Sequence, residues 1–168
     1  MGYVHDTSMS QYIPPTLFHF STGTITEIAG QTVGTIVEHR AAANQTTLIT
    51  IPILIPSNAS ALKGSYLKSV EIDYEILTAE PTSLTFTINK VTRGADGADA
   101  AVAAVTKTAS LSYATAKAVD EHKNVLTITT PFWIDNDEYV LVELALEAGA
   151  GGNTADFIGA VANYTARF

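Results

Sequence analysis

The sequence contains no cysteine and has few charged residues. The absence of Cys excludes a disulfide framework, a thiolate metal site and cysteine-based catalysis, and it leaves the redox compartment open. Charged residues make up only 15% of the chain, whereas about 25% is usual for globular proteins. Low charge with aromatic residues retained is typical of the buried centres of protein interfaces. The composition therefore favours association over a weakly charged monomeric surface.

Basic residues are scarcer than acidic ones. The chain carries 17 acidic and 9 basic residues, a formal net charge of −8, and such a surface repels the phosphate backbone of nucleic acids. We therefore expect no direct nucleic-acid binding. No apolar run approaches the roughly 18 residues of a membrane span, because Leu48–Pro56 is short and interrupted by Thr50 and Pro52. No secretory signal pattern is visible, and no membrane contact is expected.

Alternation of apolar and polar residues is the clearest pattern in the chain. Segments with a period of two predict half-buried antiparallel strands, and no helical period persists over a dozen residues. The best examples are 70–76, 84–91, 126–130 and 140–147. A chain of 168 residues also suits one domain, which buries roughly 70% of its unfolded surface. The pattern predicts an all-β protein, an antiparallel β-sandwich. The alternative immunoglobulin-like sandwich lacks its Cys–Trp–Cys pattern here.

Three segments are less regular. Residues 1–16 are polar, lack a period and end in Pro14-Pro15, which predicts an N-terminal arm or extended entry segment before a domain at 17–168. In Thr46–Ile55, Pro52 cannot donate to a ladder, so this strand should lie at a sheet edge or carry a bulge. The Ala-rich stretch 99–119 is compatible with a short helix, a strand or an irregular segment.

The C-terminal third predicts two further features. The strand that runs into Pro131 and the strand 140–147 should be antiparallel neighbours joined by the tight turn Asp135-Asn136-Asp137. The last strand, Phe157–Phe168, is apolar on both faces. It should therefore be covered on both sides, by the rest of the fold or by a neighbouring copy.

The C-terminal half resembles the single jelly-roll structural proteins of viruses and phages. The resemblance is carried by Tyr66–Tyr74, Leu126–Pro131 and Gly159–Tyr164. The shared pattern is an alternating strand, a strand ending in Thr-Pro, an Asp/Asn turn, a long apolar strand and a closing strand with Gly and Tyr. It covers roughly 100 residues and contains no catalytic motif. It implies an antiparallel β-sandwich of about eight strands with jelly-roll topology. It also implies a capsid, decoration or other particle-forming subunit located in a virion, with further virion proteins as partners.

Two groups of acidic residues resemble cation sites. Glu71, Asp73 and Glu75 project from one strand face about 7 Å apart, where they could hold a cation between copies, although a solvated outer face is the favoured interpretation. The Asp96–Asp99 loop and the Asp135–Glu138 turn resemble calcium loops. The first lacks a further acidic ligand, and the second lacks the loop glycine and the closing glutamate. Both are best explained as turns.

The single tryptophan suggests a different kind of site. Trp133 lies in Pro131-Phe132-Trp133-Ile134, beside Asp135 and Asn136, as in a platform for stacking a sugar ring. Packing in the core or in an interface is the favoured alternative.

Motifs of known catalytic or metal sites are missing. The four histidines, His5, His19, His39 and His122, are widely spaced and form no metal-binding pair. No nucleophile elbow occurs, and Gly94–Gly97 lacks the Lys-Ser/Thr of a phosphate-binding loop. We therefore assign no catalytic, cofactor-binding or metal-binding residues and expect a protein that is not an enzyme. The Asn-x-Ser/Thr triplets at Asn44, Asn58 and Asn163 matter only in a secreted protein.

These patterns lead to two hypotheses. The first is a self-assembling capsid or decoration subunit that acts through contacts between copies, made by the last strand, the Thr46–Ile55 region and the N-terminal arm. The second is a carbohydrate- or receptor-binding β-sandwich anchored by Trp133, in an extracellular or cytoplasmic setting. No cofactor is expected in either case.

Overall fold

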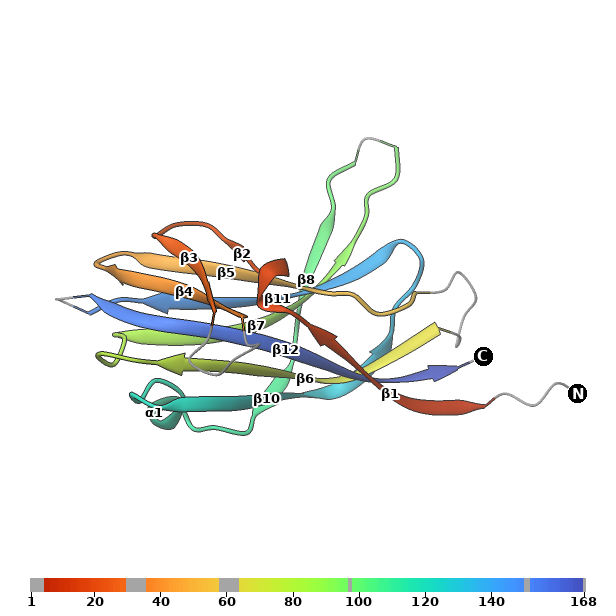
Figure 1. Ribbon diagram of the computed structural model, residues 1–168. Helices are drawn as coiled ribbons and strands as arrows, with labels where there is room; N and C mark the ends of the chain where they lie inside the picture. The colour runs from red at the N-terminus through yellow and green to blue at the C-terminus, as the bar shows by residue number, and fades with distance from the viewer. Residues whose placement is uncertain (1–4, 30–35, 58–63, 97, 150–151, 168) are drawn as a thin grey trace, which may run out of the picture.

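The computed structural model describes residues 5–29, 36–57, 64–96, 98–149 and 152–167, and within these ranges two antiparallel sheets pack face to face (Figure 1). The first sheet, sheet A, has the order β3-β4-β12-β6-β10-β9, with β1 also paired to β12. The second, sheet B, has the order β2-β5-β11-β7-β8. The strands of sheet A are β1 (Asp6–Ile13), β3 (Ile25–Ala29), β4 (Ile36–Ala43), β6 (Gly64–Ile76), β9 (Lys107–Ala109), β10 (Glu121–Trp133) and β12 (Asn153–Arg167). Those of sheet B are β2 (His19–Phe20), β5 (Thr46–Ile53), β7 (Ser83–Thr92), β8 (Ala101–Val105) and β11 (Glu138–Glu147).

The strand order is that of a jelly roll. Four strands of sheet A, β4-β12-β6-β10, face four strands of sheet B, β5-β11-β7-β8. All of their pairings are antiparallel, and the chain passes repeatedly from one sheet to the other. Two interleaved Greek keys of this kind define the fold. The expectation of an all-β antiparallel sandwich is confirmed. Within the described ranges, no helix has the length and apolar character needed to cross a membrane.

The core lies between the two sheets and follows the alternation of the sequence. Along β6 the inward residues Val70, Ile72, Tyr74 and Ile76 are all fully buried. Along β11 the inward residues Val140, Val142, Leu144 and Leu146 are buried as well, opposite those of β6 in the other sheet. A strand with one face on the core produces this pattern because successive side chains point to opposite faces. The four alternating segments therefore form the central strands of the sandwich.

The hairpin predicted around Asp135–Asp137 is wrong. β10 belongs to sheet A and pairs with β6 and β9, whereas β11 belongs to sheet B and pairs with β5 and β7. The turn therefore carries the chain from one sheet to the other. β10 also continues past Pro131 to Trp133. Its pairing with β6 shifts register between Thr127 and Phe132, and this irregularity accommodates a residue without an N–H group.

Pro52 lies at an open sheet edge, as expected. β5 pairs with β11 along its whole length, but on its other side β2 pairs only with Ile49 and Thr50. No described strand neighbours Pro52 on that side, so its missing N–H interrupts no ladder there.

Regular structure begins earlier than expected. Asp6–Ile13 forms β1, which pairs antiparallel with the C-terminal end of β12 in the same chain, and Ile13 is buried in the core. The expectation that regular structure starts after residue 16 is therefore wrong for this stretch. Its polar residues are nearly all exposed, so the strand is held by backbone pairing and leaves little periodicity in the sequence. The division into an arm at 1–16 and a domain at 17–168 stays a prediction.

The Ala-rich stretch divides into three short elements. Ala101–Val105 is β8, Lys107–Ala109 is β9, and Tyr113–Ala116 is the one-turn helix α1, whose N-cap Ser112 accepts a hydrogen bond from the Thr115 N–H. β8 pairs with β7 to form a hairpin that projects from the body of the sandwich (Figure 1).

The position of β12 explains its apolar character on both faces. It runs through the middle of sheet A, between β6 on one side and β4 and β1 on the other. Its inward side chains are buried in the core, and its outward side chains are half-buried. The fold itself therefore covers one face of β12 fully and the other face in part.

Candidate ligand-binding site

Trp133 is at the end of β10, on the outer face of sheet A, beside Tyr66 of β6. The two residues are cross-strand partners, and their ring centroids are 5.0 Å apart with an interplanar angle of 46°. Aromatic pairs at this separation and tilt attract each other beyond the effect of area burial. Both rings remain partly exposed. They form a small apolar platform next to solvent.

Arg167 and Asp6 join this platform to β1. Arg167, near the end of β12, donates to Asp6 through Nε at 2.6 Å and through Nη2 at 2.8 Å. The guanidinium also lies over the Trp133 ring, 4.8 Å from its centroid. The hydrogen bond from Arg167 lowers the pKa of the Asp6 carboxyl, and the same bond raises the pKa of Arg167. An ionised carboxylate and a planar cation are therefore held at fixed positions beside the rings.

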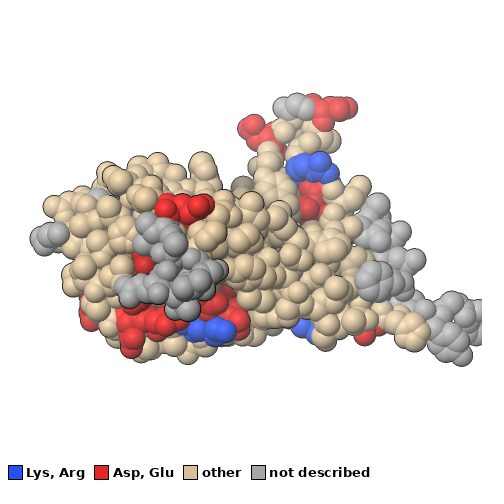
Figure 2. Space-filling model, in the orientation of Figure 1, with Lys and Arg blue, Asp and Glu red and all other residues tan. Residues whose placement is uncertain are grey.

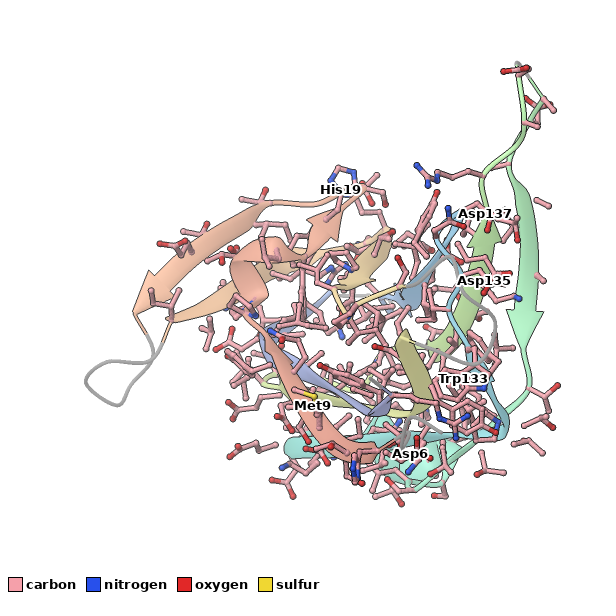
Figure 3. The ribbon with its side chains drawn as sticks, turned by 90° about the vertical axis from the view of Figure 1, so that its right-hand side faces the viewer. Asp6, Met9, His19, Trp133, Asp135 and Asp137 are labelled. Carbon is pink, nitrogen blue, oxygen red and sulfur yellow. The ribbon has the colours of Figure 1, made fainter. Side chains whose placement is uncertain are left out.

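These groups line a pocket of about 440 Å³, together with Lys68 and Thr165. Figure 3 shows Asp6 and Trp133 at the same end of the molecule, below the turn that carries Asp135 and Asp137. The described lining offers two cations, one carboxylate, two hydroxyl groups and two aromatic rings. Such a mixture suits a ligand that has both an apolar face and several hydroxyl or anionic groups.

Strand register brings the site together. Tyr66 pairs with Trp133 on one side and with Thr165 on the other, and Arg167 pairs with Asp6. The six residues come from four strands, and side chains two apart on a strand share a face. Only Trp133 was singled out from the sequence. Tyr66, Lys68 and the residues near the two chain ends carry no local motif, so only the pairing of strands distant in sequence reveals them.

The acidic stripe behaves mainly as an outer sheet face. Glu71 accepts from Lys123 Nζ at 3.3 Å. Partial burial raises the pKa of Asp73 and of Glu75, and nearby carboxylates add to the effect. Figure 2 shows acidic side chains gathered at the lower left of the molecule. In the described part of the chain, however, no three acidic or histidine residues are arranged to hold a metal ion.

Hydrogen bonds of the turn explain the acidic residues at 135–138. The Glu138 carboxylate accepts from Lys90 Nζ at 2.6 Å and from the Asp135 N–H at 3.2 Å. It therefore closes its own turn and pairs with the neighbouring strand. In the other acidic loop, the Ala98 N–H bonds to the Ala95 carbonyl at the tip of the β7–β8 hairpin, and Gly97 lies outside the described residues.

The histidines occupy separate places. His19 is exposed on β2 in sheet B, whereas His39 on β4 contacts Asp156 at 2.5 Å. His122 is buried between the sheets, where its ring packs on Tyr74 and its Nε2 contacts the Ala118 carbonyl at 2.8 Å. His5 is exposed at the start of β1. The contacts of His39 and of His122 are each accounted for by their own neighbours.

The Asn-x-Ser/Thr triplets differ in accessibility. Asn44 is exposed between β4 and β5. Asn163 lies within β12, where its Oδ1 accepts from Ser10 Oγ at 2.6 Å, so the sheet holds this side chain. Asn58 lies outside the described residues.

Comparison with known proteins gives only distant likenesses. No protein-family model and no curated protein sequence matches the chain. Among solved structures, a family 35 carbohydrate-binding module from Clostridium thermocellum is 13% identical over 91% of this chain and 97% of its own, with a TM-score of 0.43. A structure of carbohydrate-binding modules from the β-sandwich superfamily is 8% identical over 95% of this chain and 56% of its own, with a TM-score of 0.46.

A phage protein is also among the similar structures. The enzymatically active domain of tailspike protein 4 of bacteriophage CBA120 is 9% identical over 88% of this chain, with a TM-score of 0.45. This chain spans only 19% of that domain. All three likenesses are to proteins of very different sequence and have low structural overlap. These likenesses therefore do not indicate a ligand for this chain.

Proposed function

We propose that this protein is a carbohydrate-binding β-sandwich whose site is the pocket around Trp133. The observation that carries the proposal is the Tyr66–Trp133 platform set beside the Asp6–Arg167 ion pair. Sugars combine apolar C–H faces with many hydroxyl groups. Aromatic rings bind the first, and charged hydrogen-bonding groups bind the second.

The dimensions of the pocket are compatible with the end of a glycan chain. A volume of about 440 Å³ is within the roughly 300–1,000 Å³ of small-molecule sites. Because the Arg167 guanidinium already covers part of the Trp133 ring, a sugar ring would lie against Tyr66 and the uncovered part of Trp133. Lys68, Asp6 and Arg167 would then contact its hydroxyl groups. These contacts need little rearrangement, since the ion pair and ring pair already exist without a sugar.

Binding without hydrolysis fits this pocket better than catalysis. Hydrolysis of a glycosidic bond generally uses two carboxyl groups, one of which must carry a proton. Among the described residues that line the pocket, Asp6 is the one that carries a carboxyl group. The pKa of this carboxyl is lowered by Arg167, which keeps it ionised and unsuited to donate a proton. The described lining of this pocket is therefore better suited to holding a sugar than to hydrolysing a glycosidic bond.

A glycan array followed by calorimetric titration tests the proposal. We expect at least one glycan class to bind. Trp133→Ala should weaken that binding about tenfold or more, since stacking and burial of an aromatic ring contribute on the order of 1–2 kcal/mol. Tyr139→Ala is the matched control, because Tyr139 is 41% exposed on β11 and lines no part of this pocket. An array without binders, or binding indifferent to Trp133→Ala, would refute the proposal.

A second candidate function is self-assembly in a particle such as a virion. The specific observation is β8, an edge strand whose residues are almost all exposed, with Val102 64% exposed, on the projecting hairpin. An unpaired edge of small apolar residues is a template for pairing with another strand. In this hypothesis two copies join through β8.

Light-scattering mass at micromolar concentration distinguishes this candidate. Assembly through β8 predicts a multimer that Val102→Lys converts to monomer, because a charge on an edge strand opposes pairing. Val119→Lys is the control, since Val119 is 49% exposed between α1 and β10. A purely monomeric native protein would remove the case for assembly.

A further inference from the structure

A second pocket lies between the two sheets, at the edge of sheet A that is formed by β9. It has a volume of about 260 Å³, and its floor is formed by buried residues of both sheets, Leu84 of β7 and Leu126 of β10. The segment that contains β9 and α1 forms its outer wall, with Leu111 and the half-exposed Tyr113. None of these residues belongs to the Trp133 pocket. The lining is mainly apolar and concave, as in small-molecule sites.

One polar side chain in the floor has an unused donor. Asn124 is 1% exposed, between the inward residues His122 and Leu126 of β10. Its Oδ1 accepts from Ser110 Oγ and from the Leu111 N–H, both at 3.4 Å. Its Nδ2 is buried without a hydrogen-bond partner. A buried unpaired donor costs about 1–3 kcal/mol, and an acceptor atom reaching the floor of the pocket would satisfy it.

The same pocket is also lined by a positively charged side chain. Lys107 of β9 lines it and, among the described residues, makes no ion pair. Burial lowers the pKa of its ammonium group. A positive charge that is partly desolvated and has no anionic partner attracts an anion more strongly than a fully hydrated one does.

We propose that this pocket binds a small amphipathic carboxylate, with its apolar body against Leu84, Leu111 and Tyr113 and its carboxylate between Lys107 Nζ and Asn124 Nδ2. The apolar lining would bind the apolar body of the ligand, and the Lys107 ammonium and the unpaired Asn124 donor would bind its carboxylate. The volume lies just below the roughly 300 Å³ at which pockets for drug-sized ligands begin. Molecules of the size of benzoate or hexanoate therefore suit the pocket.

Titration with benzoate and hexanoate, followed by amide chemical shifts of the isotope-labelled full chain, tests this site. We expect saturable shifts with a dissociation constant of about 1 mM or tighter. They should be concentrated at Leu111, Tyr113 and the side-chain amide of Asn124. Benzyl alcohol and 1-hexanol, which have similar bodies without the charge, should bind more weakly. Shifts confined to residues around Trp133, or no saturation up to about 20 mM, would overturn the proposal.

Two variants test the contacts of the carboxylate separately from those of the apolar body. Lys107→Met should weaken carboxylate binding about tenfold and leave alcohol binding unchanged, as expected for loss of a charge-assisted contact. Lys123→Met is the matched control, because Lys123 lies on the outer face of sheet A and pairs with Glu71. Asn124→Asp keeps the size of the side chain but replaces the donor with a carboxylate. It should exclude benzoate and still admit benzyl alcohol.

The outcomes remain decisive if one variant is unstable. Should Asn124→Asp fail to fold, Lys107→Met alone carries the test, since Lys107 is on the pocket wall and not in the core. Equal losses of benzoate and benzyl alcohol in Lys107→Met would contradict the assigned role of the ammonium. Equal losses in Lys107→Met and Lys123→Met would show a general charge effect and no site. Because the glycan test uses Trp133, failure of either proposal leaves the other unaffected.

Discussion

The ring of Tyr12 lies directly over the Cα of Gly159, across the pair formed by β1 and β12. A Cβ at position 159 would be 2.7 Å from Cε2 and from the hydroxyl oxygen of Tyr12. That hydroxyl donates to the Ile158 carbonyl at 3.0 Å. Gly159 has φ +155° and follows a register shift in the pairing of β12 with β6. The bulge and the absent side chain together create the space that the Tyr12 ring of β1 fills.

Gly159→Ala should destabilise the protein. The added methyl group collides with the Tyr12 ring, and overpacking of this kind costs about 1–3 kcal/mol, which corresponds to a fall in melting temperature of about 3–10 °C. Thermal unfolding followed by circular dichroism measures the change. Gly149→Ala is the control, because its Cβ would meet its nearest neighbour, Thr82 Oγ1, at an ordinary 3.6 Å. In Tyr12→Ala, the Gly159→Ala penalty should shrink, and an undiminished penalty would contradict the steric explanation.

Arg40→Lys should also destabilise the protein, by about 2 kcal/mol or more. Arg40 of β4 is fully buried and donates to Thr47 Oγ1 at 2.7 Å, to the Asn153 carbonyl at 2.8 Å and to the Gln45 carbonyl at 2.9 Å. A lysine cannot reach acceptors on three segments from one ammonium group. Urea unfolding measures the loss. Arg93→Lys, at an exposed position, should change the free energy of unfolding little; similar effects of both changes would refute a special role for the buried guanidinium.

Asp73→Asn should stabilise the protein at pH 7 but not well below pH 3.8, the ordinary pKa of an aspartate. Burial raises the pKa of Asp73 above that value, so the folded state binds this proton more tightly than the unfolded state does. The resulting cost is fully present above the raised pKa, shrinks as the pH falls through it and is gone below the ordinary pKa. Melting temperatures of the variant and the native protein should therefore converge on acidification.

Asp6→Asn provides a control of opposite sign. The pKa of Asp6 is lowered by Arg167, so its stabilising contribution is present above the ordinary value of 3.8 and is lost as the pH falls through the lowered pKa. This variant should melt at a lower temperature than the native protein at pH 7. A stabilised Asp6→Asn, or a destabilised Asp73→Asn, at pH 7 would contradict the electrostatic picture.

Removal of residues 2–13 tests whether the N-terminal strand stabilises its own chain. The deletion removes β1 and the buried Ile13 and uncovers the edge of β12 over Ala160–Arg167. We expect a lower melting temperature and, because an exposed edge invites pairing, a concentration-dependent increase in light-scattering mass. Removal of residues 2–4 is the control. An unchanged melting temperature and mass would show that β1 contributes nothing to the isolated chain.

The sequence alone determined the fold class, and the central strands show why. Along β6, Val70 to Ile76 alternate with acidic residues, and this period of two is a local property that needs no knowledge of partners. β1 and β9 are the opposite case. They are short or exposed and are held by backbone pairing, which is available to almost any side chain, so their residues give no period.

The candidate ligand-binding site was only partly visible in the sequence. Trp133 could be singled out because a lone tryptophan beside polar residues is unusual, but the sequence does not indicate that Tyr66, Thr165 and Arg167 lie next to it. The predicted hairpin around Asp135–Asp137 was wrong for the same reason. A turn is encoded locally, whereas the sheet that the following strand joins depends on which partner buries the most apolar surface.

Local sequence is therefore enough to specify the alternating strands, the acidic and cysteine-free character, and the aromatic anchor of the proposed site. Contacts between distant segments set the strand order, the partial covering of β12 by its own chain, and the placing of Asp6 and Arg167 beside Trp133. This division arises because side-chain periodicity is fixed by backbone geometry within a strand. Cross-strand register is fixed by packing between residues that are as many as 161 positions apart, as with Asp6 and Arg167.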